Sequence, residues 1–422
     1  MSEAILEAWK QELDKPGEAF FAALAAQLRE PDGARDAARE AIKLLVPRIG
    51  WETYLPHIPH GLLGLAAVFR LRPLLKEASF CRVLATQLHA FAHEGRRLRP
   101  WDISKGSGHW PNVEMAMARH LPHLAYGELQ GVEQPEAADF RRVGAAIAHD
   151  MANMGHKAVM AHRMGDLFIA LERPKASGRR LLGLSAWLAA SEPEDRFWAK
   201  RAAARIGEGF IVPEKGDALP DEAAREVCDL GLVEMLNAFT ARMKAGASQS
   251  GLLDVLVRAA SEKLLDARRD LEGKTSWAFA YLATLAEQMG ADGQAWCQAA
   301  ALVNLFPTDE AEGRIQVEPS TAPSEAALVD AILDAEPAKA MGLAQALDTD
   351  AALRALAEAA SQNDPAFNHS HHLLAVASAA DLTPRLGAQA RGVLLAAIAK
   401  SLANSQGSSD LGRKADKVFQ AP

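Results

Sequence analysis

Apolar side chains recur along this chain at the spacing of helix faces. One stripe near the N-terminus is closed by the turn-forming residues 30–33, and it consists of Phe20, Phe21, Leu24 and Leu28. Near the C-terminus, Thr383 and Pro384 form a helix-start signal, an N-cap followed by proline at the first helical position. The apolar positions that follow share one helical face: Leu386, Ala390, Val393, Leu394 and Ala397. Both patterns predict amphipathic helices.

Helix-end signals and residue usage extend this interpretation to the rest of the chain. Ser191 and Glu194 have capping-box spacing ahead of a predicted helix over 196–206, and Gly207 is placed to end it. Alanine is frequent and β-branched runs are nearly absent, which favours helices over strands. We therefore predict an all-α protein, either a multi-helix bundle or a helical-hairpin array. No repeat of fixed period can be aligned.

The distribution of proline, glycine and polar residues predicts the organisation of the chain. We expect a main helical domain over 1–306, a linker or long loop over 307–323, and a C-terminal helical part over 324–403 that packs on the first. Residues 404–422 begin with a polar, glycine-bearing segment and are predicted to be a disordered tail. A further loop, rich in glycine and tryptophan, is expected over 99–111.

Charge and cysteine usage restrict the class of protein. The 422 residues carry 46 Lys and Arg against 54 Asp and Glu, so the net charge is 46 − 54 = −8. This mild acidity argues against nucleic-acid or polybasic membrane binding and suits a soluble cytoplasmic protein, as does the acidic start of the chain. The apolar runs are too short to span a membrane. Three cysteines far apart in sequence predict neither a disulfide framework nor a cysteine-rich zinc site.

Histidine is the residue type that points to chemistry. No nucleotide-binding, phosphate-loop, zinc-protease or serine-hydrolase motif is present. The 13 histidines cluster in sequence, and imidazole is a common ligand of zinc, iron and copper. The clusters are His57 with His60, His89 with His93, His149 with His156 and His162, and His369 with His371 and His372.

Each cluster has a structural alternative to metal binding. His60 opens an apolar helix that runs to Phe69, but it could also serve only as a hydrogen-bonded residue of a proline-rich turn. His89 and His93 share a helix face, yet His93 precedes a charged segment that is typical of an exposed helix end. His149 and His156 are seven residues apart and would share a face over two helical turns. His369 and His372 can converge, whereas His371 points elsewhere, and these histidines could also cap or fill the fold.

Two further groups of residues are weaker candidates. The arginine pairs Arg179–Arg180 and Arg268–Arg269 could bind an anion, although such pairs on helices usually face water. The tryptophans could line a pocket for a flat ligand, but core anchoring is the commoner role. They are Trp101, Trp110, Trp187, Trp198, Trp277 and Trp296.

Three short motifs resemble the questin oxidase-like family. They are His60-Gly61-Leu62-Leu63, Gly155-His156-Lys157-Ala158-Val159, and the late His369-x-x-His372 segment, spread over roughly residues 50–380. The resemblance implies a helical protein that cleaves aromatic polyketides such as anthraquinones oxidatively, with a non-heme iron held by several histidines and a carboxylated lysine. His60, His156 and His369 match histidines of the family's motifs. Two features depart from them: His372 replaces the lysine of the late motif, and no His-x-x-Met element is present around residues 20–28.

The preferred hypothesis is a metal-dependent oxidoreductase that uses dioxygen on an aromatic or polycyclic molecule. The predicted ligands of a divalent metal, with Fe(II) favoured, are His60, His156, His369 and His372, and His371 is a predicted general base. Asp150 or Glu114 could orient a ligand ring. Two alternatives remain open: a helical-repeat scaffold that binds a protein partner, and a metal-dependent hydrolase built on His89 and His93. The sequence leaves the oligomeric state open.

Overall fold

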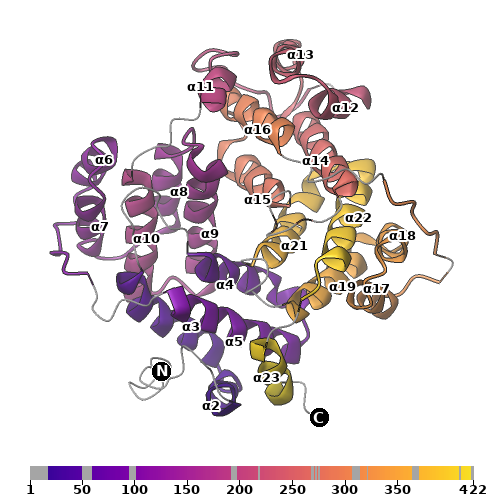
Figure 1. The fold of residues 1–422 in the computed structure, drawn as a ribbon. Coiled ribbons are helices and arrows are strands. Elements are labelled where there is room, and N and C mark those ends of the chain that lie inside the picture. Colours follow the sequence, from indigo (N-terminus) through magenta and orange to yellow (C-terminus); the bar gives the residue numbers. More distant parts are fainter. Residues whose placement is uncertain are drawn as a thin grey trace. The chain divides into compact units, whose positions relative to one another are not determined.

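The structure is a computed structural model, and its described residues are helical (Figure 1). They are residues 18–49, 59–94, 101–191, 197–216, 219–267, 270, 273, 276–306, 314–320, 322–363, 370–407 and 410–419. Among them there is no β-sheet, only an isolated bridge between Ile211 and Asp292. The predicted all-α class is therefore confirmed. None of the helices in this part of the chain is long and apolar enough to cross a membrane.

The chain divides into two units, and each is described by itself. The first unit comprises residues 1–194, 361–370 and 408–422. Its helical elements are α2 (Glu18–Leu28), α3 (Gly33–Leu45), η1 (Val46–Arg48), α4 (His60–Leu71), η2 (Arg72–Leu74), α5 (Glu77–Glu94), α6 (Trp110–Ala118), α7 (Pro122–Gln130), α8 (Ala137–Ala146), η3 (Ala152–Gly155), α9 (His156–Ala170), α10 (Lys175–Ala190) and α23 (Asp410–Phe419).

In the first unit, α4 packs against both α5 and α9, and α9 also packs against α8 and α10. Helix α4 is apolar around its whole circumference, and every residue from Gly61 to Phe69 is buried. A helix of this kind must lie in a core, because no polar face is available to meet water. The position of α4 fixes that of His60, its first residue.

The second unit comprises residues 195–360 and 371–407. Its helical elements are α11 (Phe197–Ala203), α12 (Glu222–Asp229), α13 (Leu232–Lys244), α14 (Gln249–Asp266), α15 (Trp277–Thr284), the π-helical turn η5 (Leu285–Met289), α16 (Gly293–Leu305), α17 (Glu325–Leu333), α18 (Pro337–Ala346), α19 (Thr349–Gln362, of which the last two residues belong to the first unit), α21 (His371–Leu382), η6 (Thr383–Arg385) and α22 (Ala388–Asn404).

Buried lysines close helix ends inside the second unit. Lys400 of α22 donates from Nζ to the carbonyls of Leu264, Leu265 and Ala267 at the C-terminus of α14. Lys263 of α14 likewise donates to the carbonyls of Asn304 and Phe306 after α16. Burial lowers the pKa of both ammonium groups. These contacts satisfy carbonyls that a helix end leaves without an intrahelical partner, and they join α22, α14 and α16.

The predicted helices exist, but some of their ends lie elsewhere. The stripe from Phe20 to Leu28 forms α2 as expected, with its apolar residues buried. Thr383 and Pro384 begin the short turn η6, and α22 starts only at Ala388 after Gly387, so the predicted N-cap is wrong. Ser191 follows the end of α10, and Glu194 lies outside the described residues. Helix α11 ends at Ala203, ahead of the left-handed Gly207.

The two units run across the predicted domain boundaries. The first predicted domain, 1–306, contributes residues to both units. The first unit also includes residues 361–370, which follow a part of the chain that belongs to the second unit. Within the second unit, α21 packs on α15 and α22 packs on α14, so C-terminal helices do pack on earlier ones. The described residues 314–320 of the predicted linker form no helix or strand, as expected, and residues 307–313 lie outside the described residues.

The segment 410–419 forms the helix α23, where the sequence predicts a disordered tail. Leu411, Ala415 and Phe419 recur at helical spacing in a segment that is otherwise charged and polar. Helix α23 packs against α2 and α5 of the same unit. Asp416 accepts a hydrogen bond of 2.5 Å from Arg82 Nε, and the Arg82 side chain is 2% exposed. Tertiary contacts therefore order a segment whose composition alone favours disorder.

The loop over 101–109 is held by a carboxylate. Glu128 of α7 accepts hydrogen bonds from Ser107, through the backbone N at 3.0 Å and Oγ at 2.8 Å, and from Asn112 Nδ2 at 3.5 Å. Burial raises the pKa of Glu128, but the hydrogen bonds outweigh this effect, so the pKa lies below its ordinary value. The ionised carboxylate is thus the form that the native structure favours.

We expect Glu128→Gln to be less stable than the parent protein at neutral pH, and the difference to shrink on acidification. A carboxyl whose pKa is lowered by folding stabilises the protein above its unfolded pKa, and that contribution is lost as the pH falls through the folded pKa. Urea midpoints of both proteins between neutral and acidic pH measure the difference. The exposed Glu133→Gln serves as a control. A pH-independent difference would contradict the assignment.

Candidate metal centre

His60 is placed at the start of α4 by the geometry of the preceding proline. Pro59 is extended, with φ −71° and ψ 91°, and its carbonyl accepts from the backbone N–H groups of Leu62 and Leu63. The chain thus enters the helix at His60. The His60 side chain is half-buried, while the residues that follow it are buried.

A carboxylate from α5 caps this helix start. The Gly61 backbone N donates to both Oε1 and Oε2 of Glu94, at 3.1 Å each. Burial raises the pKa of Glu94 to about 8, against the lowering effect of hydrogen bonds from the backbones of Gly61 and His60. Gly61 has no room for a side chain, because a Cβ would lie 2.5 Å from the backbone N of Phe91. Close packing of α4 on α5 therefore fixes the backbone that carries His60.

His156 begins α9 after an unusual backbone. Asn153, Met154 and Gly155 are consecutive left-handed residues, with φ 47°, 58° and 80°. Two non-glycine residues in this region are strained, and such strain is concentrated at functional sites. The turn brings the Asn153 carbonyl to 2.5 Å from Nδ1 of His156. Since a carbonyl only accepts, Nδ1 carries the proton and Nε2 has the lone pair that a metal ligand requires.

The structure brings His60 and His156 together. Their ring centroids are 5.6 Å apart and the ring planes meet at 68°. One ring nitrogen from each lies within 4.8 Å of the other. Two nitrogens bound to one metal ion, each about 2.1 Å from it, lie at most about 4.2 Å apart. A small rotation of either imidazole therefore brings the pair into bonding range.

A buried ion pair follows directly on His156. The Lys157 side chain is 0% exposed, and its Nζ donates to Asp150 Oδ2 at 2.6 Å and to the Ser191 carbonyl at 3.1 Å. Asp150, which could orient a ligand ring, is paired with Lys157 in the structure. The ion pair joins the turn before α9 to the end of α10. It fixes the segment from which His156 projects.

Ser370 brings a distant segment of the chain to α4 and α5. Its Oγ donates to Oε1 of the buried Gln87 at 2.7 Å, and a Cβ on Gly64 would lie 2.6 Å from the same Oγ. Ser370 has a left-handed backbone with φ 66°. Nε2 of Gln87 has no hydrogen-bond partner among the described residues. Ser370 is the last residue of the first unit before the chain enters the second at His371.

His371 and His372 are the first two residues of α21 in the second unit, and both are buried. The His371 ring centroid lies 5.5 Å from that of Trp277 in α15. A Cβ on Gly273 would lie 2.2 Å from the Cβ of His371, so glycine is required there. Burial, and secondarily His371, lower the pKa of His372 to about 3. His372 is thus a neutral imidazole at physiological pH.

The remaining candidate residues have other surroundings or lie outside the described residues. His57 and His369 are outside the described residues. His149 is exposed, and the helical relation predicted between it and His156 is wrong, because α8 ends at Ala146. Glu114 is exposed and accepts from Arg142 at 2.6 Å. His162 is buried and has Nε2 3.6 Å from Asp166.

The His89–His93 alternative receives no further ligand in the described part of the chain. His93 is exposed, and His89 is half-buried with its ring 6.2 Å from that of Phe20. Neither belongs to a group of three or more possible ligand side chains among the described residues. A metal site built on this pair would therefore need residues beyond the described ranges.

The tryptophans and arginine pairs serve packing where they are described. Trp101 stacks on Trp187 with ring centroids 4.3 Å apart, and Trp277 and Trp296 are buried. Arg180 donates to Tyr126 Oη and to Gln130, joining α10 to α7. Arg268 and Arg269 lie outside the described residues.

Comparison of the chain with protein-family models, with curated proteins and with solved structures found no match. The residues and geometry described above are therefore the only basis for a functional assignment of the candidate site. The likeness to the questin oxidase-like family rests on the short motifs around His60, His156 and His369.

Proposed function

We propose that the protein is a metal-dependent oxidoreductase that uses dioxygen on an aromatic or polycyclic small molecule. His60 and His156 bind the metal ion. The supporting observation is the convergence of His60 and His156, which lie in different helices of one unit, with ring nitrogens within 4.8 Å. Sites built from facing helices of a bundle are a common way to hold a metal.

The donor set fits a borderline divalent metal. Both side chains offer neutral imidazole nitrogen, which suits iron(II), zinc and copper better than magnesium or calcium. The hydrogen bond from His156 Nδ1 to the Asn153 carbonyl presents Nε2 as the donor atom. Iron(II) held by imidazoles, with coordination positions left open, would supply the activation of dioxygen.

The further residues that the sequence assigns to this site stay predictions. They are the ligands His369, which lies outside the described residues, and His372, with His371 as a general base.

Contacts within the first unit hold the backbones of both histidines in place. Glu94 holds the start of α4, and Lys157 with Asp150 holds the turn before α9, so neither histidine backbone needs to reorganise when a metal binds. The resemblance to the questin oxidase-like family supports an electron-rich aromatic substrate, such as a hydroxylated anthraquinone. His60 and His156 would hold the metal, which would supply the activation of dioxygen next to such a substrate.

Metal analysis of protein purified without an affinity tag tests this proposal. We expect about one iron, manganese or zinc ion per chain, and at least a tenfold loss of metal affinity in His60→Ala and His156→Ala, because each removes one of few ligands. His93→Ala, which alters an exposed histidine, should keep the metal. Oxygen uptake with a hydroxylated anthraquinone then tests the reaction.

The result also decides between the alternatives. Substoichiometric metal in the parent protein would contradict the proposal and favour a helical scaffold. Metal lost from His89→Ala but kept in His156→Ala would favour the hydrolase.

A further inference from the structure

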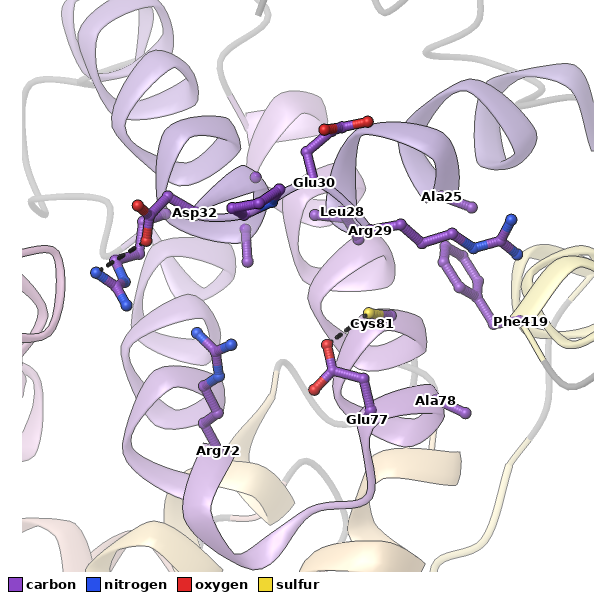
Figure 2. Close-up of a pocket in the computed structure, with 14 residues that line it drawn as sticks. Ala25, Leu28, Arg29, Glu30, Asp32, Arg72, Glu77, Ala78, Cys81 and Phe419 are labelled. Atoms are coloured by element: carbon purple, nitrogen blue, oxygen red, sulfur yellow. Dashed lines mark hydrogen bonds and ion pairs between the residues drawn. The ribbon is translucent and has the colours of Figure 1, made fainter.

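A cavity of about 550 Å³ lies in the first unit between α2, α3, α5 and α23, away from the histidine pair (Figure 2). Its volume falls within the range of small-molecule sites. Its lining contains both apolar and charged residues. The apolar lining includes Ala25, Leu28, Ala78 and Phe419.

Charged residues of both signs line the cavity: Arg29, Arg35 and Arg72, and Glu30, Asp32 and Glu77. Arg29 and Arg72 are exposed. Arg29 and Arg72 have no ion pair among the described residues, whereas Arg35 is paired with Asp32 and Glu172. The Arg72 guanidinium lies 4.8 Å over the Phe80 ring, a contact that holds a cation without cancelling its charge. In Figure 2, Arg72 extends along the cavity wall towards Asp32. Arg72 thus offers a charge-assisted donor to an anion.

Helix α3 begins at the cavity. Its N-cap Asp32 is left-handed, with φ 61°, and makes no side-chain capping hydrogen bond. Gly33, Ala34 and Arg35, the first residues of α3, line the cavity. The first-turn N–H groups of a helix carry partial positive charge, which adds to that of Arg72.

Cys81 marks the floor of the cavity. Its Sγ lies 3.7 Å from Glu77 Oε1, and burial, with Glu77, raises its pKa to about 11, while Arg72 and Arg29 act in the opposite direction. Both arginines therefore act electrostatically on the floor of the cavity. The thiol gives a chemical reporter inside the site.

We propose that this cavity binds a small organic monoanion with an apolar body, such as an aromatic carboxylate. Its carboxylate lies between Arg72 and the start of α3, and its apolar body lies against Ala78, Leu28 and Phe419. The apolar and charged residues of the lining require both properties in one molecule. An inorganic anion would leave the apolar lining in contact with water. A neutral aromatic molecule would make no charge-assisted hydrogen bond with Arg72.

Calorimetric titration with 1-naphthoate tests the proposal, and the neutral isostere 1-naphthamide provides the matched probe. We expect saturable one-to-one binding of the carboxylate and affinity at least about tenfold lower for the amide, because a charge-assisted hydrogen bond is lost. Arg72→Gln should weaken naphthoate binding by a similar factor. Ala78→Phe, which adds bulk at the apolar lining, should abolish it. Arg119→Gln, an exposed arginine of the same unit outside the cavity, should leave it unchanged.

Alkylation of Cys81 by iodoacetamide locates the binding. Naphthoate should slow modification of Cys81 at least several-fold, while Cys228 and Cys297, which lie in the second unit, should react as before. Binding that is equal for acid and amide, unaffected by Arg72→Gln, or without protection of Cys81 would overturn the proposal. The test does not depend on the metal site, so either proposal can fail alone.

Discussion

Replacing Asp150 with alanine is expected to lower the free energy of unfolding by about 3–5 kcal/mol. Lys157 is 0% exposed and its Nζ lies 2.6 Å from Asp150 Oδ2. Removing the carboxylate leaves an ammonium in the core with the Ser191 carbonyl at 3.1 Å but without that charge partner. Loss of one member of a buried ion pair costs more than loss of both, because the remaining charge keeps its desolvation penalty.

A double-mutant cycle separates the charge effect from packing. Lys157→Met keeps much of the side-chain volume and removes the ammonium, so Asp150→Ala should cost far less in that background than in the parent. Urea unfolding of the four proteins gives the coupling energy. Glu114→Ala, which removes the exposed partner of Arg142, is the matched control and should change stability by about 1 kcal/mol or less. Additive effects of the two buried substitutions would contradict the ion pair.

The helical class could be predicted because local and tertiary preferences agree along most of the chain. In α2 the apolar residues Phe20, Phe21, Leu24 and Leu28 are all buried, as their spacing requires. Alanine-rich segments such as α22 favour helix whatever they pack against. A helix can be predicted from sequence when its intrinsic helix propensity and the spacing of its buried residues indicate the same structure.

Helix ends were less predictable, because several chain conformations satisfy the same signal. Thr383 and Pro384 start a short 3₁₀ turn instead of α22, and Asp254 Oδ1 accepts from Gly387 N, the residue before the helix, at 3.0 Å. That carboxylate comes from α14, far away in sequence, so no local pattern could reveal it. Helix α23 is a similar case, since its order depends on contacts with α2 and α5.

The sequence singled out His60 and His156, whose rings lie close together, but not the residues that position them. His60 and His156 stand out because each opens a helix beside glycine. The Asn153 carbonyl that orients His156 depends on a left-handed turn, and Glu94 reaches Gly61 only through the packing of α5 on α4. The sequence holds a signal for the second contact, since a carboxylate at the end of a helix is electrostatically unfavourable unless another helix start faces it. The cavity around Arg72 has no sequence motif.

Gly61→Ala is expected to cost about 3 kcal/mol or more and, if the proposed metal site exists, to abolish metal binding at the same time. The added Cβ would lie 2.5 Å from the backbone N of Phe91 and 2.7 Å from its Cα. Backbone atoms cannot rotate away as a side chain can, so α4 must move off α5. The Gly61 N–H would then leave Glu94, and His60, the adjacent residue, would shift relative to His156.

The same substitution at Gly392 provides the control, because it adds the same methyl group at a position that has room for it. Gly392 lies inside α22, and a Cβ there would meet nothing within 4 Å. Gly392→Ala should therefore stabilise the protein by about 0.5–1 kcal/mol, through the lower backbone entropy of the unfolded chain, and leave the metal bound. If α4 packs on α5 as described, thermal unfolding should show lower stability for Gly61→Ala and higher stability for Gly392→Ala. Metal content should fall only in Gly61→Ala. Equal stability of the two variants would show that the contact of Gly61 with Phe91 is wrong, and with it the placement of His60.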